Sequence, residues 1–210
     1  MREIMIKAQS FDYIILGGGC AALSLASHIS DKNIDSPSFL ILEKRKKYTD
    51  DRSWCFWSEK ENTLNKLISY SWDNFSIGLK NKNVIHKSKK YNYKYVRSID
   101  FYNNALEKIK KAPNINLYLG ELIKEINKKN NNYLVYTQKN IYVTKNIIDT
   151  RPRQDIYLKE PLLFQSFLGY ELEVKHHDAK FDTAKIMDDM RLIKGAFIFD
   201  YVLPFGKNKL

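Results

Sequence analysis

The sequence predicts an α/β fold, in which a parallel sheet with helices is followed by a β-meander and by an incomplete second sheet. Three observations carry this prediction. A short apolar run ends in three consecutive glycines, a second apolar run ends in an acidic residue, and several short strand-like segments separated by turns follow. With 210 residues, 44% of them hydrophobic, the chain can bury a core in one domain or in two small ones.

The first elements predict a strand, a helix and a second strand. Residues 11–16 (FDYIIL) are a compact apolar run of the kind found in buried parallel strands, and they end at the glycines. A helix is expected over residues 20–30, and residues 38–42 (SFLIL) are typical of a second parallel strand. Glu43 stands at the carboxyl end of that strand.

The glycine turn matches the pattern G-x-G-x-x-A of dinucleotide-binding domains. In such turns the glycines allow a tight bend and let backbone N–H groups approach a diphosphate at the start of the helix, while the alanine lets helix and strand pack closely. An acidic residue after the second strand accepts hydrogen bonds from a ribose hydroxyl. The residues that this pattern assigns to a cofactor are Gly17, Gly18, Gly19, Cys20, Ala21, Ala22 and Glu43.

Two alternatives stay open for this turn. A glycine turn can occur in an α/β domain that binds no nucleotide, and NAD(P) could take the place of FAD. The later β-meander favours FAD, because a plain NAD domain would continue as alternating strands and helices. We therefore expect a Rossmann-like FAD-binding domain of the large flavoprotein type over residues 1–150, with a substrate-side segment inserted. Residues 151–210 are expected to begin a substrate domain.

The middle of the chain consists mainly of strand-like segments. From residue 72 to residue 96, Tyr91, Tyr93 and Tyr95 alternate so that their rings share one face. A helix is expected from Ser98, as N-cap, to a point before Pro113. Five short strands follow, which we interpret as a β-meander and a last strand that returns to the parallel sheet; their ranges are 115–119, 122–126, 133–137, 141–144 and 146–150.

The last part of the chain is rich in apolar and aromatic residues. Residues 165–174 and 196–205 are predicted strands with a mixed segment between them, and together they predict a second sheet in a separate layer. The sequence stops soon after the second of these strands, without a terminal helix. We expect it to be truncated after Leu210.

The charge of the chain bears on its partners. The formal net charge is +11, from 35 Lys and Arg against 24 Asp and Glu. Lysines are spread along the whole length, which favours a solvated basic surface, with attraction to an anionic membrane surface as the second interpretation. No basic stripe interleaved with stacking aromatics is present, so nucleic acid is not expected as a partner. The two cysteines and four histidines lack metal-ligand spacing, so no metal is predicted.

Several blocks of the sequence together resemble the lycopene β-cyclase family of carotenoid biosynthesis, of the bacterial type. The first block, DYIILGGGCAALSLA from residue 12, is shared by many flavoproteins, whereas the aromatic block WCFW at residues 54–57 is much more specific. The remaining blocks are YVRSIDFY (95–102), IDTRP (148–152), QSFLG (165–169), FD (181–182), IMD (186–188) and YVLP (201–204).

This resemblance implies an intramolecular lyase or isomerase that binds FAD, uses its reduced form, and closes the ψ-ends of lycopene into β-ionone rings without net redox change. NAD(P)H is a candidate reductant. The polyene substrate implies attachment to the inner face of the membrane from the cytoplasm, as a peripheral protein. No apolar run is long enough to span a bilayer or to serve as a signal peptide.

Cyclisation requires a proton donor in a dry apolar pocket and groups that stabilise a carbocation. The resemblance makes Glu171 and Asp188 the catalytic candidates, with the best-matched proton donor expected after Leu210. Lys44 and Arg52 are further candidates for the cofactor, and Asp149 and Arg151 are expected in a turn beside it. Aromatic rings that could line the polyene site are Trp54, Phe56, Trp57, Tyr91, Tyr93, Tyr95, Phe164 and Phe167, although ordinary core packing is the favoured interpretation of any one of them.

Two other functions remain open at this point. One is a flavin-dependent oxidoreductase or monooxygenase that acts on an apolar substrate and consumes NAD(P)H. The other is an inactive fragment that binds nucleotide.

Overall fold

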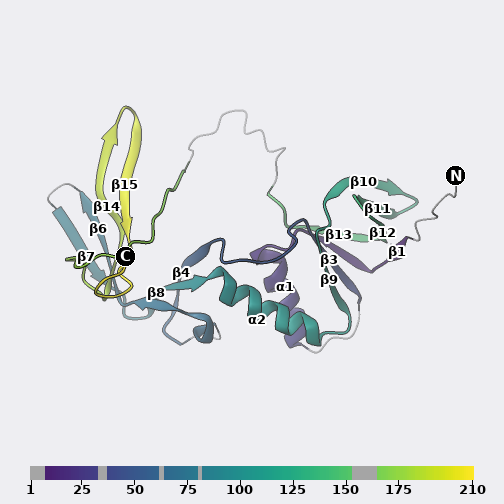
Figure 1. Cartoon of the computed structure of the whole chain (residues 1–210), viewed down its shortest axis with the longest axis horizontal. Coiled ribbons are helices and arrows are strands. Elements are labelled where there is room, and N and C mark those ends of the chain that lie inside the picture. Colours follow the sequence, from purple (N-terminus) through teal and green to yellow (C-terminus); the bar gives the residue numbers. More distant parts are fainter. Residues whose placement is uncertain (1–7, 33–36, 62–63, 80–81, 153–164) are drawn as a thin grey trace. The chain divides into compact units, whose positions relative to one another are not determined.

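The computed structural model describes residues 8–32, 37–61, 64–79, 82–152 and 165–210 (Figure 1). The chain divides into two compact units, each made of two separate stretches of sequence. Unit 1 comprises Met1–Asp51 and Ile99–Glu160, and unit 2 comprises Arg52–Ser98 and Pro161–Leu210. The candidate Phe164 lies outside the described residues.

Unit 1 contains a four-stranded parallel sheet in the order β13-β2-β3-β9 (Figure 1). Its central strands are β2 (Tyr13–Leu16) and β3 (Phe39–Glu43), whose apolar side chains are almost completely buried, as expected for a sheet covered on both faces. The outer strands are β13 (Asn146–Asp149) and β9 (Ile115–Leu119). The predicted strand–helix–strand unit and the predicted returning strand are thus confirmed.

Two helices belong to this part of the fold. Helix α1 (Cys20–Asp31) follows the glycine turn and buries Ala22, Leu23 and Ala26. Helix α2 (Ser98–Lys111) buries Tyr102, Ala105 and Ile109 at helical spacing, and it ends two residues before Pro113, which cannot continue a helix. Both helices lie where the sequence predicts them.

The β-meander is shorter than predicted. It consists of β10 (Ile123–Lys129), β11 (Asn132–Thr137) and β12 (Ile141–Thr144), to which β1 (Gln9–Ser10) adds a parallel edge. The prediction that residues 115–119 belong to the meander is wrong, because β9 pairs in parallel with β3. The meander packs on the parallel sheet through one apolar cluster, formed by Ile14, Leu16, Leu40, Leu42, Val135 and Tyr142.

Unit 2 contains two sheets (Figure 1). One has the order β15-β14-β6-β7, with β6 (Asn74–Leu79), β7 (Lys82–Lys87), β14 (Thr183–Ile193) and β15 (Ala196–Val202). The other has the order β4-β8-β5, with β4 (Ser53–Glu59), β5 (Tyr70–Trp72) and β8 (Tyr91–Arg97), and a 3-10 helix, η1 (Asn65–Leu67), precedes β5.

The predicted strand over residues 165–174 is wrong. This stretch forms no strand and makes only an isolated bridge, between Glu173 and Lys209. The mixed segment before residue 196 instead holds β14, the longest strand of the described residues, which pairs with both β6 and β15.

The core of unit 2 joins its two stretches of sequence. Trp72, Tyr93, Ala184 and Leu203 form its buried centre. The indole N–H of Trp72 donates a hydrogen bond of 3.1 Å to the carbonyl oxygen of Pro204. The most deeply buried ring in this cluster therefore has a partner for its one polar group. None of the described helices is long and apolar enough to cross a membrane.

Candidate functional site

The glycine turn of unit 1 is held by backbone and side-chain hydrogen bonds. Gly17 has φ +89°, a conformation that favours glycine, and its N–H donates to the carbonyl oxygen of Leu42 at 2.9 Å. The hydroxyl of Thr150, which follows β13, donates to the carbonyl oxygens of Leu16 (2.9 Å) and Gly17 (3.1 Å). The turn is therefore anchored to both neighbouring strands.

Gly18 is packed too tightly to carry a side chain. A Cβ at this position would lie 2.5 Å from the Tyr48 hydroxyl and 2.9 Å from Cβ of Glu43, both below ordinary contact distance. Its N–H donates to Oε2 of Glu43 at 2.6 Å, and its carbonyl oxygen accepts from Tyr48 and Arg45. Gly18 thus serves the packing of the turn.

Gly19 is open where Gly18 is crowded. Nothing lies within 4 Å of a Cβ placed on it, and it is the N-cap of α1 without a side-chain cap. The first turn of α1 carries no acidic residue, Cys20 and Ala21 are exposed, and Ala22 is buried. An uncapped helix start that borders open space and carries no acidic residue in its first turn fits a phosphate group.

Glu43 lies at the end of β3, and only 4% of its surface is exposed. Its carboxylate accepts hydrogen bonds from Gly18 N, from Arg45 N (2.8 Å) and from Arg45 Nε (3.1 Å). Burial pushes the pKa of Glu43 upward, but the hydrogen bonds from Arg45 and Gly18 outweigh burial and hold the pKa below its usual range. A second contact at Oε2, from Arg45 Nη2, is long at 3.4 Å. One acceptor position of this oxygen therefore has no close donor.

Arg45 is a part of this site that the sequence analysis missed. Its guanidinium lies over the rings of Tyr48 (4.7 Å) and Tyr102 (5.4 Å) and pairs with Glu43 and Asp51. The hydroxyl of Tyr102 in turn donates to Asp51 at 3.1 Å. The position of Arg45 two residues after the acidic residue is the signal that could have identified it. Tyr48 lies three residues after Arg45, whereas Tyr102 comes from a distant sequence position.

Arg151 and Asp149 lie beside the same turn, as predicted. They form an ion pair with 2.7 Å between Nη2 and Oδ2, and the Arg151 Cγ would lie 3.2 Å from a Cβ at Gly17. The hydrogen bonds from Arg151 lower the pKa of Asp149. This pair therefore borders the glycine turn on the side opposite to Glu43.

The two other predicted cofactor residues are Lys44 and Arg52. Lys44 is exposed. Arg52 is also exposed and falls in unit 2, where its backbone N–H and carbonyl pair with Ser98. Within the described parts of the chain, no group of three or more His, Cys, Asp or Glu could hold a metal ion.

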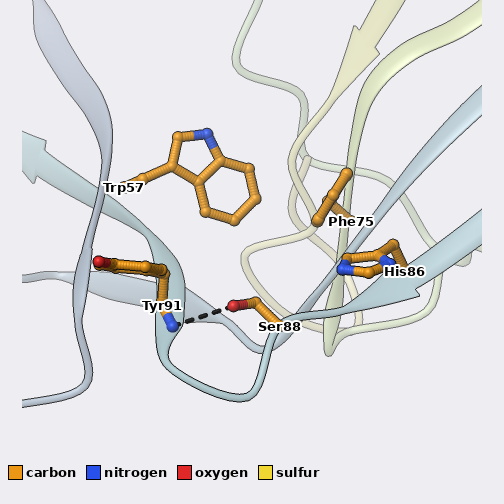
Figure 2. Close-up of a pocket in the computed structure, with 5 residues that line it drawn as sticks. All are labelled: Trp57, Phe75, His86, Ser88 and Tyr91. Atoms are coloured by element: carbon orange, nitrogen blue, oxygen red, sulfur yellow. Dashed lines mark hydrogen bonds between the residues drawn. The ribbon is translucent and has the colours of Figure 1, made fainter.

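Unit 2 carries an aromatic pocket of about 210 Å³ (Figure 2). Trp57 from β4 meets Phe75 from β6 edge to face, with ring centroids 4.8 Å apart, and Phe75 lies 5.1 Å from the His86 ring. The remaining lining residues, Ser88 and Tyr91, are linked by a hydrogen bond of 3.0 Å from Tyr91 N to Ser88 Oγ. The pocket is lined mainly by ring faces and offers few polar groups.

The predicted aromatic residues divide between this pocket and the core. Trp57 and Tyr91 line the pocket, whereas Tyr93 and Tyr95 belong to the core cluster around Trp72. The Tyr93 and Tyr201 hydroxyls lie 2.7 Å apart, and burial raises the pKa of both. The other three predicted aromatics are Trp54 and Phe56 on β4 and the exposed Phe167.

The two predicted catalytic carboxylates lie in unit 2, and each forms an ion pair. Glu171 pairs with Lys209, and its side chain is 62% exposed. Asp188 on β14 pairs with Lys185 at 2.6 Å, its side chain is 21% exposed, and it lies against Gly78. Neither carboxylate lies in enclosed apolar surroundings.

Comparisons with known proteins give a family match and a likeness in fold. Its sequence matches the family described as lycopene cyclase protein over residues 12–210. No curated protein matches the sequence.

Solved structures resemble the chain in fold. They include p-nitrophenol 4-monooxygenase PnpA from Pseudomonas putida DLL-E4 (TM-score 0.55, 12% identity, 68% of this chain and 41% of that chain). A second is PqsL, a probable FAD-dependent monooxygenase from Pseudomonas aeruginosa (0.52, 9%, 66% and 42%). A third is CtdE in complex with FAD and a substrate (0.52, 13%, 67% and 37%).

This likeness shows a flavoprotein fold. The chain spans about two fifths of the length of these three structures.

Proposed function

The chain belongs to the lycopene cyclase family, and from this premise we propose that it is a lycopene β-cyclase polypeptide that binds FAD and cyclises the ends of an apolar polyene. The family match over residues 12–210 carries the proposal, because it includes both units. The glycine turn adds a second, independent support, since its open, uncapped helix start suits a diphosphate.

In this proposal, unit 1 is a Rossmann-like domain for FAD. The N–H groups at Gly19 and Cys20 would hold the diphosphate at the start of α1. Glu43 would accept a ribose hydroxyl at the one position that Arg45 and Gly18 leave available on its carboxylate. Arg151, next to Gly17, supplies positive charge near the same turn. Lys44 and Arg52 are less suited, since both are exposed and Arg52 falls in unit 2.

The proposed reaction is an acid–base cyclisation without net redox change. When bound in its reduced form, FAD would supply negative charge near the cationic centre that forms in the substrate. NAD(P)H is the proposed source of the reducing equivalents.

The chain's own contribution lies in unit 2, where the aromatic pocket of Trp57, Phe75 and Tyr91 can receive an apolar chain end. Its aromatic rings can stabilise positive charge.

Within this chain, Asp188 is the better of the two candidates for a catalytic carboxylate. It is less exposed than Glu171 and sits on a strand with backbone irregularities on both sides of it. Such bulges often redirect a side chain next to an active site. Proton donation by a residue beyond Leu210 remains part of the proposal.

Attachment to a membrane surface is also part of the proposal. Since β6 and β14 run parallel, the β6–β7 and β14–β15 turns lie at the same end of their sheet. Leu79, Val84, Leu192 and Phe197 near these turns are strongly exposed. Apolar side chains on a chain of net charge +11 suit an anionic lipid surface from the cytoplasmic side. Co-sedimentation with phosphatidylglycerol vesicles, and its loss in Leu192→Asp/Phe197→Asp, tests this attachment.

A flavin-dependent monooxygenase is the second candidate, because the structures of similar fold include monooxygenases. The two functions differ in stoichiometry. A monooxygenase consumes NAD(P)H and O₂ with every turnover, whereas the cyclase needs only enough reductant to reduce its flavin.

The test is expression in bacteria that accumulate lycopene, with pigments separated by chromatography. The 210-residue chain is compared with the same chain together with any sequence that follows Leu210 in its gene. We expect β-ring carotenoids from at least the longer form, under anaerobic conditions as well. Soluble, flavin-loaded protein that leaves lycopene unchanged would overturn the proposal, and substrate-dependent NAD(P)H and O₂ consumption would favour the monooxygenase.

A further inference from the structure

Both backbone groups of Gly18 are held by side chains. Its N–H donates to Glu43 Oε2 at 2.6 Å. Its carbonyl oxygen accepts two hydrogen bonds, from the Tyr48 hydroxyl at 2.8 Å and from Arg45 Nη2 at 3.0 Å. Three side chains from the segment after β3 therefore fix the orientation of one residue in the glycine turn.

The held carbonyl determines where the next N–H points. In a trans peptide, the C=O of one residue and the N–H of the following residue point in opposite directions. Because the Gly18 carbonyl is turned toward Arg45 and Tyr48, the Gly19 N–H is turned away from them. Nothing lies within 4 Å of a Cβ on Gly19, so this residue borders open space.

We propose that Arg45 and Tyr48 are positioning residues, which lock the peptide between Gly18 and Gly19 so that its N–H, and not its carbonyl oxygen, faces the diphosphate of FAD. The inference rests on the proposed function. If this peptide turned over, a carbonyl oxygen would face the anion and a hydrogen-bond donor would be lost.

Arg45 is well suited to hold this orientation, because its guanidinium has contacts on all sides. Its faces lie over Tyr48 and Tyr102, and its edges bond to Glu43, Gly18 and the Tyr102 hydroxyl. Burial lowers the pKa of Arg45, but the hydrogen bonds from its own N–H groups to Glu43 and Tyr102 outweigh burial and raise it, so the group stays charged. A fork of fixed geometry with this many partners cannot turn away without breaking several bonds at once.

Two conservative variants test the role of these side chains. Tyr48→Phe removes the hydroxyl that bonds to Gly18 and keeps the ring over Arg45. Arg45→Lys keeps the charge beside Glu43 and removes the planar fork. Tyr118→Phe is the matched control, since that hydroxyl makes one long hydrogen bond, of 3.4 Å to Gln9, on another part of unit 1.

Two measurements on the 210-residue chain separate positioning from general stability. The first is the dissociation constant for FAD, followed by flavin fluorescence. The second is the amide resonance of Gly19 in ¹⁵N-labelled protein without flavin, which reports the orientation of the peptide itself.

In the double variant Tyr48→Phe/Arg45→Lys, we expect FAD to bind at least about tenfold more weakly than in the wild-type chain. We also expect a displaced or doubled Gly19 resonance, and neither change in Tyr118→Phe.

The outcomes are distinguishable. If the double variant binds FAD as tightly as the wild-type chain does, the positioning role is wrong, even if the chain is a flavoprotein. If the wild-type chain binds no FAD, the proposed function is wrong. The role of Arg45 and Tyr48 in orienting the peptide is then decided by the Gly19 resonance alone, and an unmoved resonance in the double variant refutes it.

Discussion

The backbone N–H of Gly18 and the carboxylate of Glu43 are joined by a hydrogen bond of 2.6 Å, which links the glycine turn after β2 to the end of β3. The two residues also touch through carbon, because a Cβ on Gly18 would lie 2.9 Å from the Glu43 Cβ. The acidic residue therefore does two things in unit 1. It shapes the glycine turn from inside, and it holds the Arg45 guanidinium beside that turn.

Gly18→Ala should destabilise unit 1. The new methyl group would meet the Tyr48 hydroxyl at 2.5 Å, so Tyr48 and Glu43 must move and their bonds to Gly18 weaken. We expect a loss of about 1–3 kcal/mol in the free energy of unfolding, the range for overpacked sites. Urea denaturation followed by circular dichroism measures it. A variant as stable as wild type would show that this contact is looser than the structure indicates.

Glu43→Gln should change how stability depends on pH. The pKa of Glu43 in the folded chain lies below its ordinary value of 4.5, so its ionised form stabilises the fold above that pH. This contribution is lost as the pH falls from 4.5 through the folded-state pKa, because over that range the unfolded state binds a proton at Glu43 more readily than the folded state does. The variant should lose about 1–3 kcal/mol at pH 7, with a flatter decline below pH 4.5, in unfolding experiments across pH. Parallel acid profiles for the two proteins would contradict the assignment.

Trp72→Phe should weaken unit 2 strongly. The substitution removes the indole donor to Pro204 and leaves space in the core. We therefore expect a loss of about 2–4 kcal/mol in the free energy of unfolding. Trp57→Phe is the matched control, because that side chain is 43% exposed, and it should cost less than about 1 kcal/mol. Thermal unfolding of both variants measures the difference. Equal effects would argue against Trp72 as the centre of this core.

Lys94→Met should also destabilise unit 2. The buried ammonium group donates to the carbonyl oxygens of Glu59 (2.6 Å) and Lys60 (3.1 Å) and to Oδ1 of Asn65 (2.7 Å), and burial lowers its pKa. Removing it leaves these acceptors without this donor. We expect a loss of about 1–3 kcal/mol in the free energy of unfolding, measured by urea denaturation.

Lys90→Met is the control for this prediction. It breaks an exposed ion pair with Glu59 and a contact with the Tyr91 ring at 5.4 Å, and should cost at most about 1 kcal/mol. A loss of similar size in both variants would show that the buried hydrogen bonds of Lys94 stabilise unit 2 no more than an exposed ion pair does.

The parts of the fold that the sequence predicts well are those with strong local signals. The apolar strand, the glycines and the helix of residues 13–31 depend on neighbouring residues, as does α2 with its Ser98 start and Pro113 limit. The strand β9 has the right local pattern, but its partner is β3, more than seventy residues earlier, and no local pattern reveals that choice.

The errors in unit 2 have the same origin. The strand β14 contains Asp188, Asp189 and Arg191, which lowers its apolar pattern, and it is held as a strand by β6 and β15. Residues 165–174 have the apolar pattern, but their backbone pairing is short: Leu172 and Val174 bond to Leu210 and Asn208 without forming a strand. In the site, Glu43 was predictable from its place after a strand. Tyr48 follows Arg45 by three residues, whereas Tyr102 contacts Arg45 only because the fold brings α2 beside the end of β3.

The binding of FAD at the glycine turn is tested most directly by Gly19→Ala, with FAD titrated into the variant and the wild-type chain. Gly19 has an ordinary φ of −79° and free space around it, so the fold should tolerate alanine at a cost of less than about 1 kcal/mol. The account predicts that wild type binds FAD and that this variant, equally folded by circular dichroism, binds it at least about tenfold more weakly, because the methyl group fills the space meant for the diphosphate. Unchanged FAD affinity in folded Gly19→Ala, or no FAD binding by folded wild type, would contradict it.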